Sequence, residues 1–371
     1  MPHKVGIPRA LVYYNYFPWW RGFFEALEAE VVVSGETTKQ TLDHGVRLAV
    51  DEACLPVKVF FGHVLELSRQ KVDFIFVPRI VSVERKAFIC PKFMGLPDMV
   101  RNAIPDLPSL IDVTVDLRHR PKRRLWKAAR QVGRQLGASP FRVIRAVFGA
   151  QKRQRVFQDL LVKQLTPPEA LAAMEGKSRP EGSGKALSGK AAENRDNWLP
   201  QEYPGAKRLK VAVLGHSYNI YDQLASQNVI RRLREMGVQV VTADMLPAPL
   251  IRAGNQKLAK PLFWTFGKKI AGAAFHWLGN GGVDGIVHLV SFGCGPDSMV
   301  GELVQREAWR GKTTPFMLLT LDEHTGESGI VTRLEAFVDM LRHRMSLKEK
   351  GHPGEQGNPG GEDKPLQKGG V

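Results

Sequence analysis

The 371-residue chain contains only three cysteines, Cys54, Cys90 and Cys294. A small, odd number of cysteines excludes the disulfide framework of small secreted proteins and indicates a reducing compartment. The chain also lacks an uninterrupted apolar run of membrane-spanning length, and its first residues lead into a strand-like segment instead of a signal sequence. We therefore expect a cytoplasmic protein with no membrane partner.

Several well-known sequence motifs are absent. The chain has no Cys-x-x-Cys, no His-Glu-x-x-His, no nucleophile elbow and no Walker A lysine motif. No Gly-x-Gly-x-x-Gly follows a predicted strand, and the glycine-rich segment 279–282 precedes one, so we predict a turn there. Because phosphate cradling needs such a loop, we predict that the chain has no ATPase activity of its own.

Acidic residues are missing from one long segment. From Arg118 to Arg155 there are 13 Lys or Arg and no Asp or Glu, whereas the whole chain has a net charge of +16. The basic character therefore belongs to a local patch, which also contains aromatic residues such as Trp126 and Phe148. A solvated helical face is one interpretation, and contact with nucleic acid or an acidic partner is another. The lack of a known RNA- or DNA-binding motif argues against nucleic acid.

Short apolar segments alternate with amphipathic helical segments at both ends of the chain, which is typical of parallel βαβ units. The first part predicts strands at 4–7, 30–33, 74–77 and 110–115, with helices at 19–27, 42–50 and 57–67. The last part predicts strands at 211–214, 238–241, 286–290 and 316–321, with helices at 221–236, 262–278 and 330–345. We therefore predict an α/β protein with two Rossmann-like lobes, each containing a parallel sheet of about four strands.

Composition divides the chain into five parts. Residues 1–117 and 207–345 are the predicted lobes, and residues 118–174 are a basic helical insertion that we expect to project from the two-lobe core. Residues 175–206 are rich in Gly, Ser and Lys and predict a flexible linker. Residues 346–371 are rich in Gly, Pro and charge and predict a disordered tail.

Each cysteine is followed by Pro or Gly within two residues, which is unusual for a cysteine of the hydrophobic core. Cys90 and Cys294 each follow a predicted strand, and the working edge of a parallel sheet lies beyond the carboxyl ends of its strands. Cys54 precedes a predicted helix, whose N-terminus favours thiolate over thiol. We expect the three to converge between the lobes as ligands of an iron–sulfur cluster, since three cysteines leave one iron of a cubane open. Three buried, inert thiols are the alternative.

Several blocks of the sequence resemble one known superfamily. They are Gly6–Leu11, Ala49–Lys58, Phe61–His63, Pro78–Glu84, Ile89–Asp98, Gly293–Ser298 and Asp322–Glu327. Together they resemble the 2-hydroxyacyl-CoA dehydratase and benzoyl-CoA reductase superfamily, and within it the branch described as CoA-substrate-specific enzyme activase-related, or CoA protein activase. The resemblance covers residues 3–115 and 207–345, and the blocks around Cys54 and Cys90 are its most specific parts.

The resemblance implies a [4Fe–4S] cluster, cubane or double cubane, held by the three cysteines in an anaerobic, oxygen-sensitive protein. It implies an ATP-dependent activase of the actin and sugar-kinase type as electron donor, a homologous partner subunit, and an acyl-CoA substrate. The chain would be a redox component of a dehydratase-like lyase or of a cluster-dependent reductase. It lacks the ATPase domains that some relatives carry in the same chain, and its substrate is unassigned. The alternative function is a non-catalytic adaptor or scaffold that pairs with a homologous subunit.

The resemblance also bears on the polar residues near the cysteines. Three cations are candidates to neutralise the charge of a cluster: Lys58, Arg79 and Lys92. Three residues after predicted strands are candidates for acid–base chemistry: His216, Glu323 and His324. Ordinary loop cations, a structural histidine and helix capping explain the same residues without a cofactor. For the basic segment, the phosphates of CoA are a third interpretation.

Overall fold

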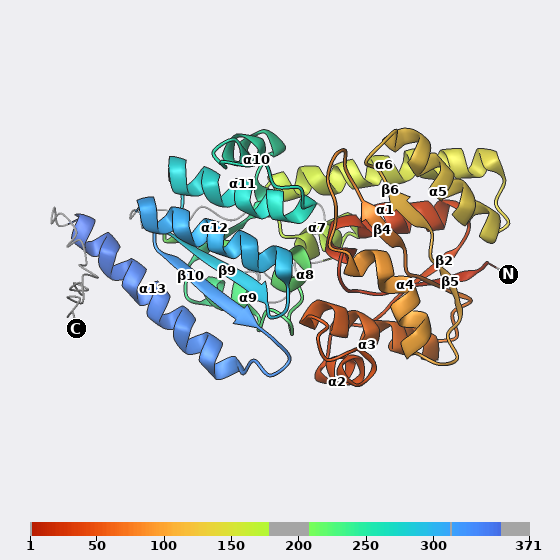
Figure 1. Ribbon diagram of the computed structural model, residues 1–371, viewed down its shortest axis with the longest axis horizontal. Helices are drawn as coiled ribbons and strands as arrows, with labels where there is room; N and C mark the ends of the chain where they lie inside the picture. The colour runs from red at the N-terminus through yellow and green to blue at the C-terminus, as the bar shows by residue number, and fades with distance from the viewer. Residues whose placement is uncertain (1, 178–207, 312–313, 350–371) are drawn as a thin grey trace, which may run out of the picture.

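The computed structural model describes residues 2–177, 208–311 and 314–349. These residues form two α/β lobes that lie side by side along the long axis of the molecule (Figure 1). Most of the predicted linker and of the predicted tail lies outside the described residues. The predicted start of the tail is wrong at 346–349, because the last helix, α13 (Glu327–Glu349), continues through these residues.

The N-terminal lobe is built on a four-stranded parallel sheet in the order β2-β1-β3-β5. Its strands are β1 (Lys4–Ile7), β2 (Glu30–Val33), β3 (Phe74–Phe76) and β5 (Ser109–Ile111). The helices of this lobe are α1 (Tyr13–Ala26), α2 (Lys39–Leu48), α3 (Leu55–Arg69) and α4 (Lys92–Ala103). The strand predicted at 110–115 is two strands, because β6 (Thr114–Asp116) leaves the sheet and pairs with β4 (Arg79–Ser82).

The C-terminal lobe repeats this topology with the order β10-β9-β7-β8, again all parallel. Its strands are β7 (Lys210–Leu214), β8 (Gln239–Thr242), β9 (Gly285–Ser291) and β10 (Phe316–Leu321). In both lobes the first strand lies between the second and the third, so the direction of winding reverses beside it. The predicted two-lobe α/β fold is confirmed, and the crevice at each reversal is the usual place for a ligand.

Helices cover both faces of the C-terminal sheet. They are α8 (Ser217–Ile220), α9 (Val229–Glu235), α10 (Ala248–Asn255), α11 (Thr265–Asn280), α12 (Gly295–Gly311) and α13. The single helix predicted at 221–236 is wrong, because Gln227 and Asn228 adopt positive φ angles of 52° and 58° and interrupt it. Within the described ranges, no helix has both the length and the apolar composition needed to span a membrane.

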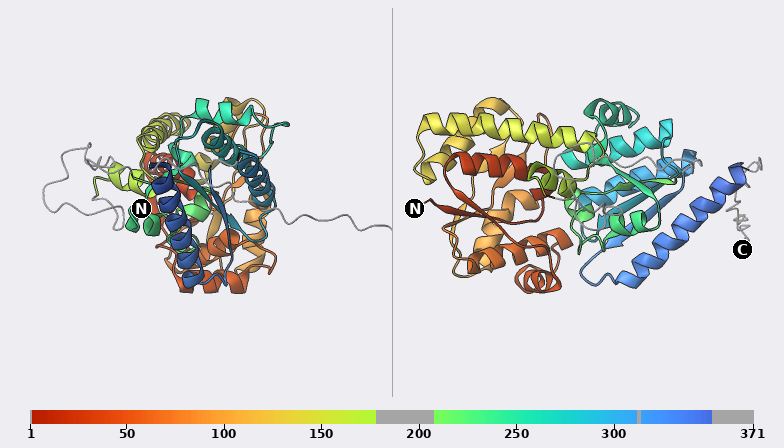
Figure 2. Two further views of the ribbon diagram at one scale, coloured as in Figure 1. Left: turned by 90° about the vertical axis from the view of Figure 1, so that its left-hand side faces the viewer. Right: turned by 180° about the vertical axis from the view of Figure 1, so that it is seen from behind.

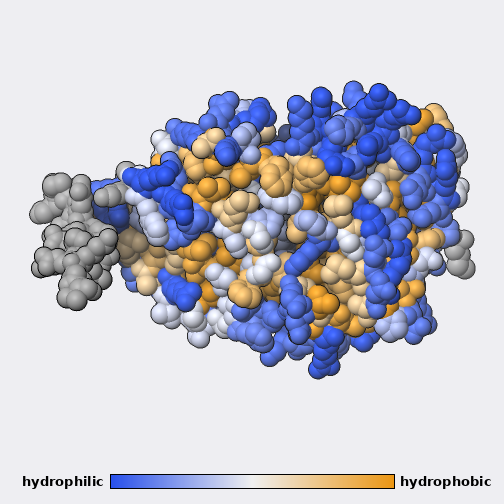
Figure 3. Space-filling model, in the orientation of Figure 1, coloured by the Kyte–Doolittle hydropathy of each residue, from blue (hydrophilic) through white to orange (hydrophobic). Residues whose placement is uncertain are grey.

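The basic segment is helical, as predicted, and forms α5 (Pro121–Gln135), α6 (Pro140–Val162) and α7 (Pro167–Met174). The expectation that it projects from the core is wrong. In Figures 1 and 2, α6 lies along α1 and runs toward the C-terminal lobe. Its apolar stripe Val143, Ala146, Val147 and Ala150 is buried in the main core. The cations of α5 and α6 lie on the exposed side of these helices, and hydrophilic side chains gather at the upper right of Figure 3, where these helices lie.

The carboxyl ends of the two sheets face each other across the lobe boundary. Asn15, at the start of α1, donates a 2.9 Å hydrogen bond to the Ser217 hydroxyl beyond β7. The backbone of Phe88 makes two hydrogen bonds to the C-terminal lobe. Its amide donates to the Phe263 carbonyl (2.8 Å), and its carbonyl accepts from the Thr265 amide (2.9 Å). Loops that follow strands of both lobes therefore meet at this boundary.

Candidate metal centre

Each cysteine stands at or just before the start of a helix. Cys54 is the N-cap of α3, Cys90 lies two residues before α4, and Cys294 immediately precedes α12. In all three cases the cysteine carbonyl accepts a backbone hydrogen bond from the first turn of the helix. Pro56, Pro91 and Pro296 fit here because a helix start needs no amide donor from its first residues. Since α3 and α4 belong to one lobe and α12 to the other, the thiols come from both lobes.

The carbonyl of Glu52 is the point where the three cysteine loops meet. Glu52 lies two residues before Cys54, and its carbonyl oxygen accepts a 3.1 Å hydrogen bond from the ammonium of Lys92, which begins α4. On the other side, a Cβ built on Gly293 would lie 3.8 Å from the same oxygen. Gly293 has φ of +73°, a conformation that favours glycine. The backbone of the Cys294 loop therefore lies close to the Cys54 loop.

The three thiols also share one electrostatic environment. Burial raises the pKa of Cys294, and the charges of Asp297, Cys54 and Cys90 raise it further. Tyr218 is buried, and the pKa of its phenol is raised well above the usual value by burial and by the charges of Cys294, Cys54, Asp297 and Cys90. Because such effects weaken with distance, each of the three cysteines lies near enough to Tyr218 for its charge to act there.

The expectation that the helix start turns Cys54 into a thiolate is wrong. Burial raises the pKa of Cys54, and neither the nearby Lys92 ammonium nor the Val57 amide offsets it. The thiols of Cys54 and Cys294 therefore keep their protons at neutral pH. A metal that binds here must displace those protons, so its affinity increases with pH.

A narrow pocket opens beside Cys90 of the N-terminal lobe and beside Pro296, which lies two residues after Cys294. Its empty volume, including the part open to solvent, is about 240 Å³. Residues of both lobes line it: Phe88, Ile89, Cys90, Phe93, His216, Tyr218, Trp264, Phe266, Gly267 and Pro296. The lining is mostly aromatic, which would keep a reacting centre away from water.

The three predicted charge-neutralising cations have different surroundings. Lys92 is the one whose charge lowers the pKa of Cys54, so it acts directly on the cysteines. Lys58 is buried and forms an ion pair with Glu323 across the lobe boundary. Arg79 binds both oxygens of Asp98, at 2.8 and 2.9 Å, and donates to the Met94 carbonyl.

The three predicted acid–base residues are also separated. His216 is buried beyond β7, stacks on Tyr218 with ring centroids 4.9 Å apart, and lines the pocket. Glu323 is the partner of Lys58. His324 is exposed, and its amide donates to the Asp322 carboxylate in a turn after β10. Of these residues, the structure brings only His216 beside Cys294.

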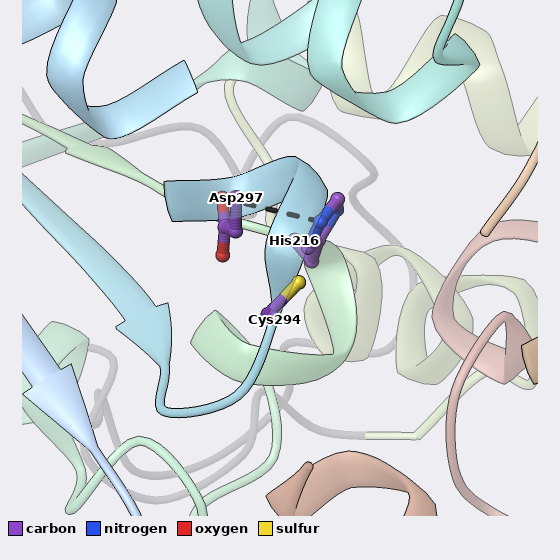
Figure 4. Close-up of side chains that lie close together, drawn as sticks. All are labelled: His216, Cys294 and Asp297. Atoms are coloured by element: carbon purple, nitrogen blue, oxygen red, sulfur yellow. Dashed lines mark ion pairs between the residues drawn. The ribbon is translucent and has the colours of Figure 1, made fainter. Parts of the chain in front are cut away.

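Asp297 is a candidate functional residue that the sequence prediction did not select. It lies in the first turn of α12, is completely buried, and has Oδ1 3.9 Å from His216 Nε2 and 3.4 Å from His288 Nε2. Figure 4 shows Asp297, His216 and Cys294 pointing toward one another. Despite burial, which opposes ionisation, the two histidines lower the pKa of Asp297. The only sequence signal was its place in the Gly-Cys-Gly-Pro-Asp block.

Comparison with known proteins places this architecture in a family. The family model of the CoA enzyme activase uncharacterised domain matches residues 4–246, which is more than half of the chain. The chain belongs to this family. The matched part contains the whole N-terminal lobe, α5 to α7, and β7 and β8 of the C-terminal lobe. No curated protein matches the chain.

The CoA enzyme activase family match includes Cys54, Cys90 and His216 and ends before Cys294 and Asp297. The basic helices α5 and α6 lie between the two ends of the match, and the inner face of α6 contributes to the same core as α1.

Proposed function

We propose that this protein is an iron–sulfur redox component whose [4Fe–4S] cluster is held by Cys54, Cys90 and Cys294. The observation that carries the proposal is the convergence of three cysteine loops from two lobes around the Glu52 carbonyl and Tyr218. Three cysteines at one place fit a cubane cluster with one iron open to a substrate or an external ligand. When bound, the cluster supplies low-potential one-electron transfer.

The residues around the thiols fit a group of that size and charge. A Cβ built on Gly295 would meet no atom within 4 Å, so the chain directly after Cys294 leaves its surroundings open. Lys92 supplies a positive charge beside Cys54, which favours a negatively charged cluster. The aromatic side chains of the pocket exclude water from the same place. His216, which lines the pocket, is the candidate to orient a substrate there.

An acyl-CoA is the substrate class that the family relationship favours, and the electron donor would be an ATP-dependent partner protein. An exposed apolar side chain accompanies each cysteine loop, which supports a protein partner at this edge. Val50 near Cys54 is 62% exposed, Met94 near Cys90 is 39% exposed, and Phe292 near Cys294 is 71% exposed. Apolar side chains gathered at a functional edge are typical of protein interfaces.

Anaerobic reconstitution tests the proposal. We expect about four iron and about four sulfide ions per chain after reconstitution, with loss of most of the iron in each of C54S, C90S and C294S. Lys127→Ala on the outer side of α5 is the control and should bind iron normally. Wild-type protein that binds no iron would contradict the proposal and favour the adaptor or scaffold function.

A further inference from the structure

His216, Cys294 and Asp297 form a compact group of buried metal-binding side chains. One ligand atom from each lies within 4.8 Å of the others, and all three residues are buried. His216 follows the end of β7, Cys294 follows the end of β9, and Asp297 lies in the first turn of α12. Strands β7 and β9 are neighbours at the point where the strand order of the C-terminal sheet reverses. Figure 4 shows the imidazole, the thiol and the carboxylate facing a common point.

Several buried polar atoms at this place have no hydrogen-bond partner. Among the described residues, nine buried side-chain nitrogen or oxygen atoms lack one, and four of these belong to His216, His288 and Asp297. Asp297 Oδ1 is one of them, although Oδ2 contacts the Asn219 amide at 3.5 Å. Polar atoms buried without partners are costly, and an ion bound between His216, Cys294 and Asp297 would remove that cost for Asp297 Oδ1.

The distances are close to those of a tetrahedral metal site. With metal–nitrogen, metal–oxygen and metal–sulfur distances of about 2.0 to 2.3 Å, the ligand atoms stand about 3.4 to 3.7 Å apart. His216 Nε2 and Asp297 Oδ1 are 3.9 Å apart and all three ligand atoms lie within 4.8 Å of one another, so the side chains must move closer together to bind an ion. His288, 3.4 Å from Asp297 Oδ1 on the other side, is placed to orient the carboxylate.

We propose that His216, Cys294 and Asp297 bind a single divalent transition-metal ion in protein that carries no iron–sulfur cluster. One imidazole, one thiolate and one carboxylate are a donor set typical of Zn²⁺, with Co²⁺ as its spectroscopic substitute. The inference does not rest on the proposed function. Because both sites use Cys294, a divalent ion at this site and a cluster on the same chain exclude each other.

Titration of cluster-free full-length protein with Co²⁺ tests the inference. We expect one Co²⁺ per chain with a thiolate-to-cobalt charge-transfer band in the near ultraviolet. C294A should abolish that band. H216Q and D297N should weaken Co²⁺ binding by more than about tenfold. Lys127→Ala on the outer side of α5, the control of the cluster experiment, should leave the Co²⁺ affinity unchanged.

X-ray absorption of zinc-loaded wild-type protein gives an answer that does not depend on how the variants fold. We expect one sulfur and two or three lighter ligands per zinc. Two or more sulfurs per zinc, a band that survives C294A, or no bound ion would overturn the inference. The iron and sulfide content of reconstituted protein is a separate measurement, so either proposal can fail without the other.

Discussion

The ion pair between Lys58 and Glu323 joins the two lobes in an almost closed environment. The side chain of Lys58 is 5% exposed and that of Glu323 is 19% exposed. Burial works against ionisation of Glu323, but the Lys58 ammonium outweighs it, so the pKa of Glu323 is lowered. Removing one partner of a buried pair leaves an uncompensated charge and costs about 3–5 kcal/mol. We expect Glu323→Gln to lower the free energy of unfolding by about 3 kcal/mol. This value is the lower end of that range because Glu323 keeps some contact with water.

The second variant removes the other partner of the pair and should cost less stability. Lys58→Met removes the more deeply buried charge and keeps the aliphatic packing, while Glu323 can turn toward water, so we expect a loss of about 1–2 kcal/mol. The double variant should be more stable than Glu323→Gln alone, because neither buried charge then remains. Urea denaturation of cluster-free protein, followed by tryptophan fluorescence and circular dichroism, measures all three. Equal stability of Glu323→Gln and the double variant would refute this reasoning.

Two further predictions concern the N-terminal lobe. Burial, with the nearby Arg9 charge, lowers the pKa of His63 from 6.5 to about 4. The folded protein then binds fewer protons than the unfolded chain between these values. The stability contributed by neutral His63 is therefore present above pH 6.5 and is lost as pH falls toward 4, by up to about 3 kcal/mol. His63→Gln should flatten this part of the stability–pH curve, and an unchanged slope would contradict the assignment. Gly45→Ala should destabilise the protein by about 3 kcal/mol, because a Cβ there would lie 1.8 Å from the Lys58 carbonyl oxygen where α2 meets α3. Gly149→Ala on α6 is its control: a Cβ there meets nothing within 4 Å, so helix propensity should make it slightly stabilising.

Three strands were predicted with their observed bounds. The runs Lys4–Ile7, Glu30–Val33 and Phe316–Leu321 begin and end in the structure where the sequence pattern placed them. Each is a short, mostly apolar segment, so its signal is local. The break between α8 and α9 was missed because it depends on two non-glycine residues with positive φ, which the pattern does not mark.

The packing of α6 had a sequence signal, but its charges obscured it. Val143, Ala146, Val147 and Ala150 recur at the spacing of one helix face, which indicates burial. The surrounding Lys and Arg residues suggested a projecting helix instead, although they occupy only the outer side.

The candidate site was predictable only where proline and glycine framed the cysteines. The unusual surroundings of Cys54, Cys90 and Cys294 drew attention to the three loops that meet at the lobe boundary. Asp297 was missed because a carboxylate in the first turn of a helix is ordinary by itself. Asp297 gains its significance from two buried histidines. His288 lies on β9, just before the Cys294 loop, whereas His216 follows β7 and is far away in the sequence.

The most direct test of the central claim is the iron and acid-labile sulfide content of anaerobically reconstituted protein, measured together with the electron paramagnetic resonance spectrum after reduction. We predict about four iron and four sulfide ions per chain and a spectrum of a reduced cubane cluster, with both lost when any one of Cys54, Cys90 and Cys294 is replaced by serine. Full iron content and an unchanged spectrum in C294S would contradict a cluster shared between the two lobes.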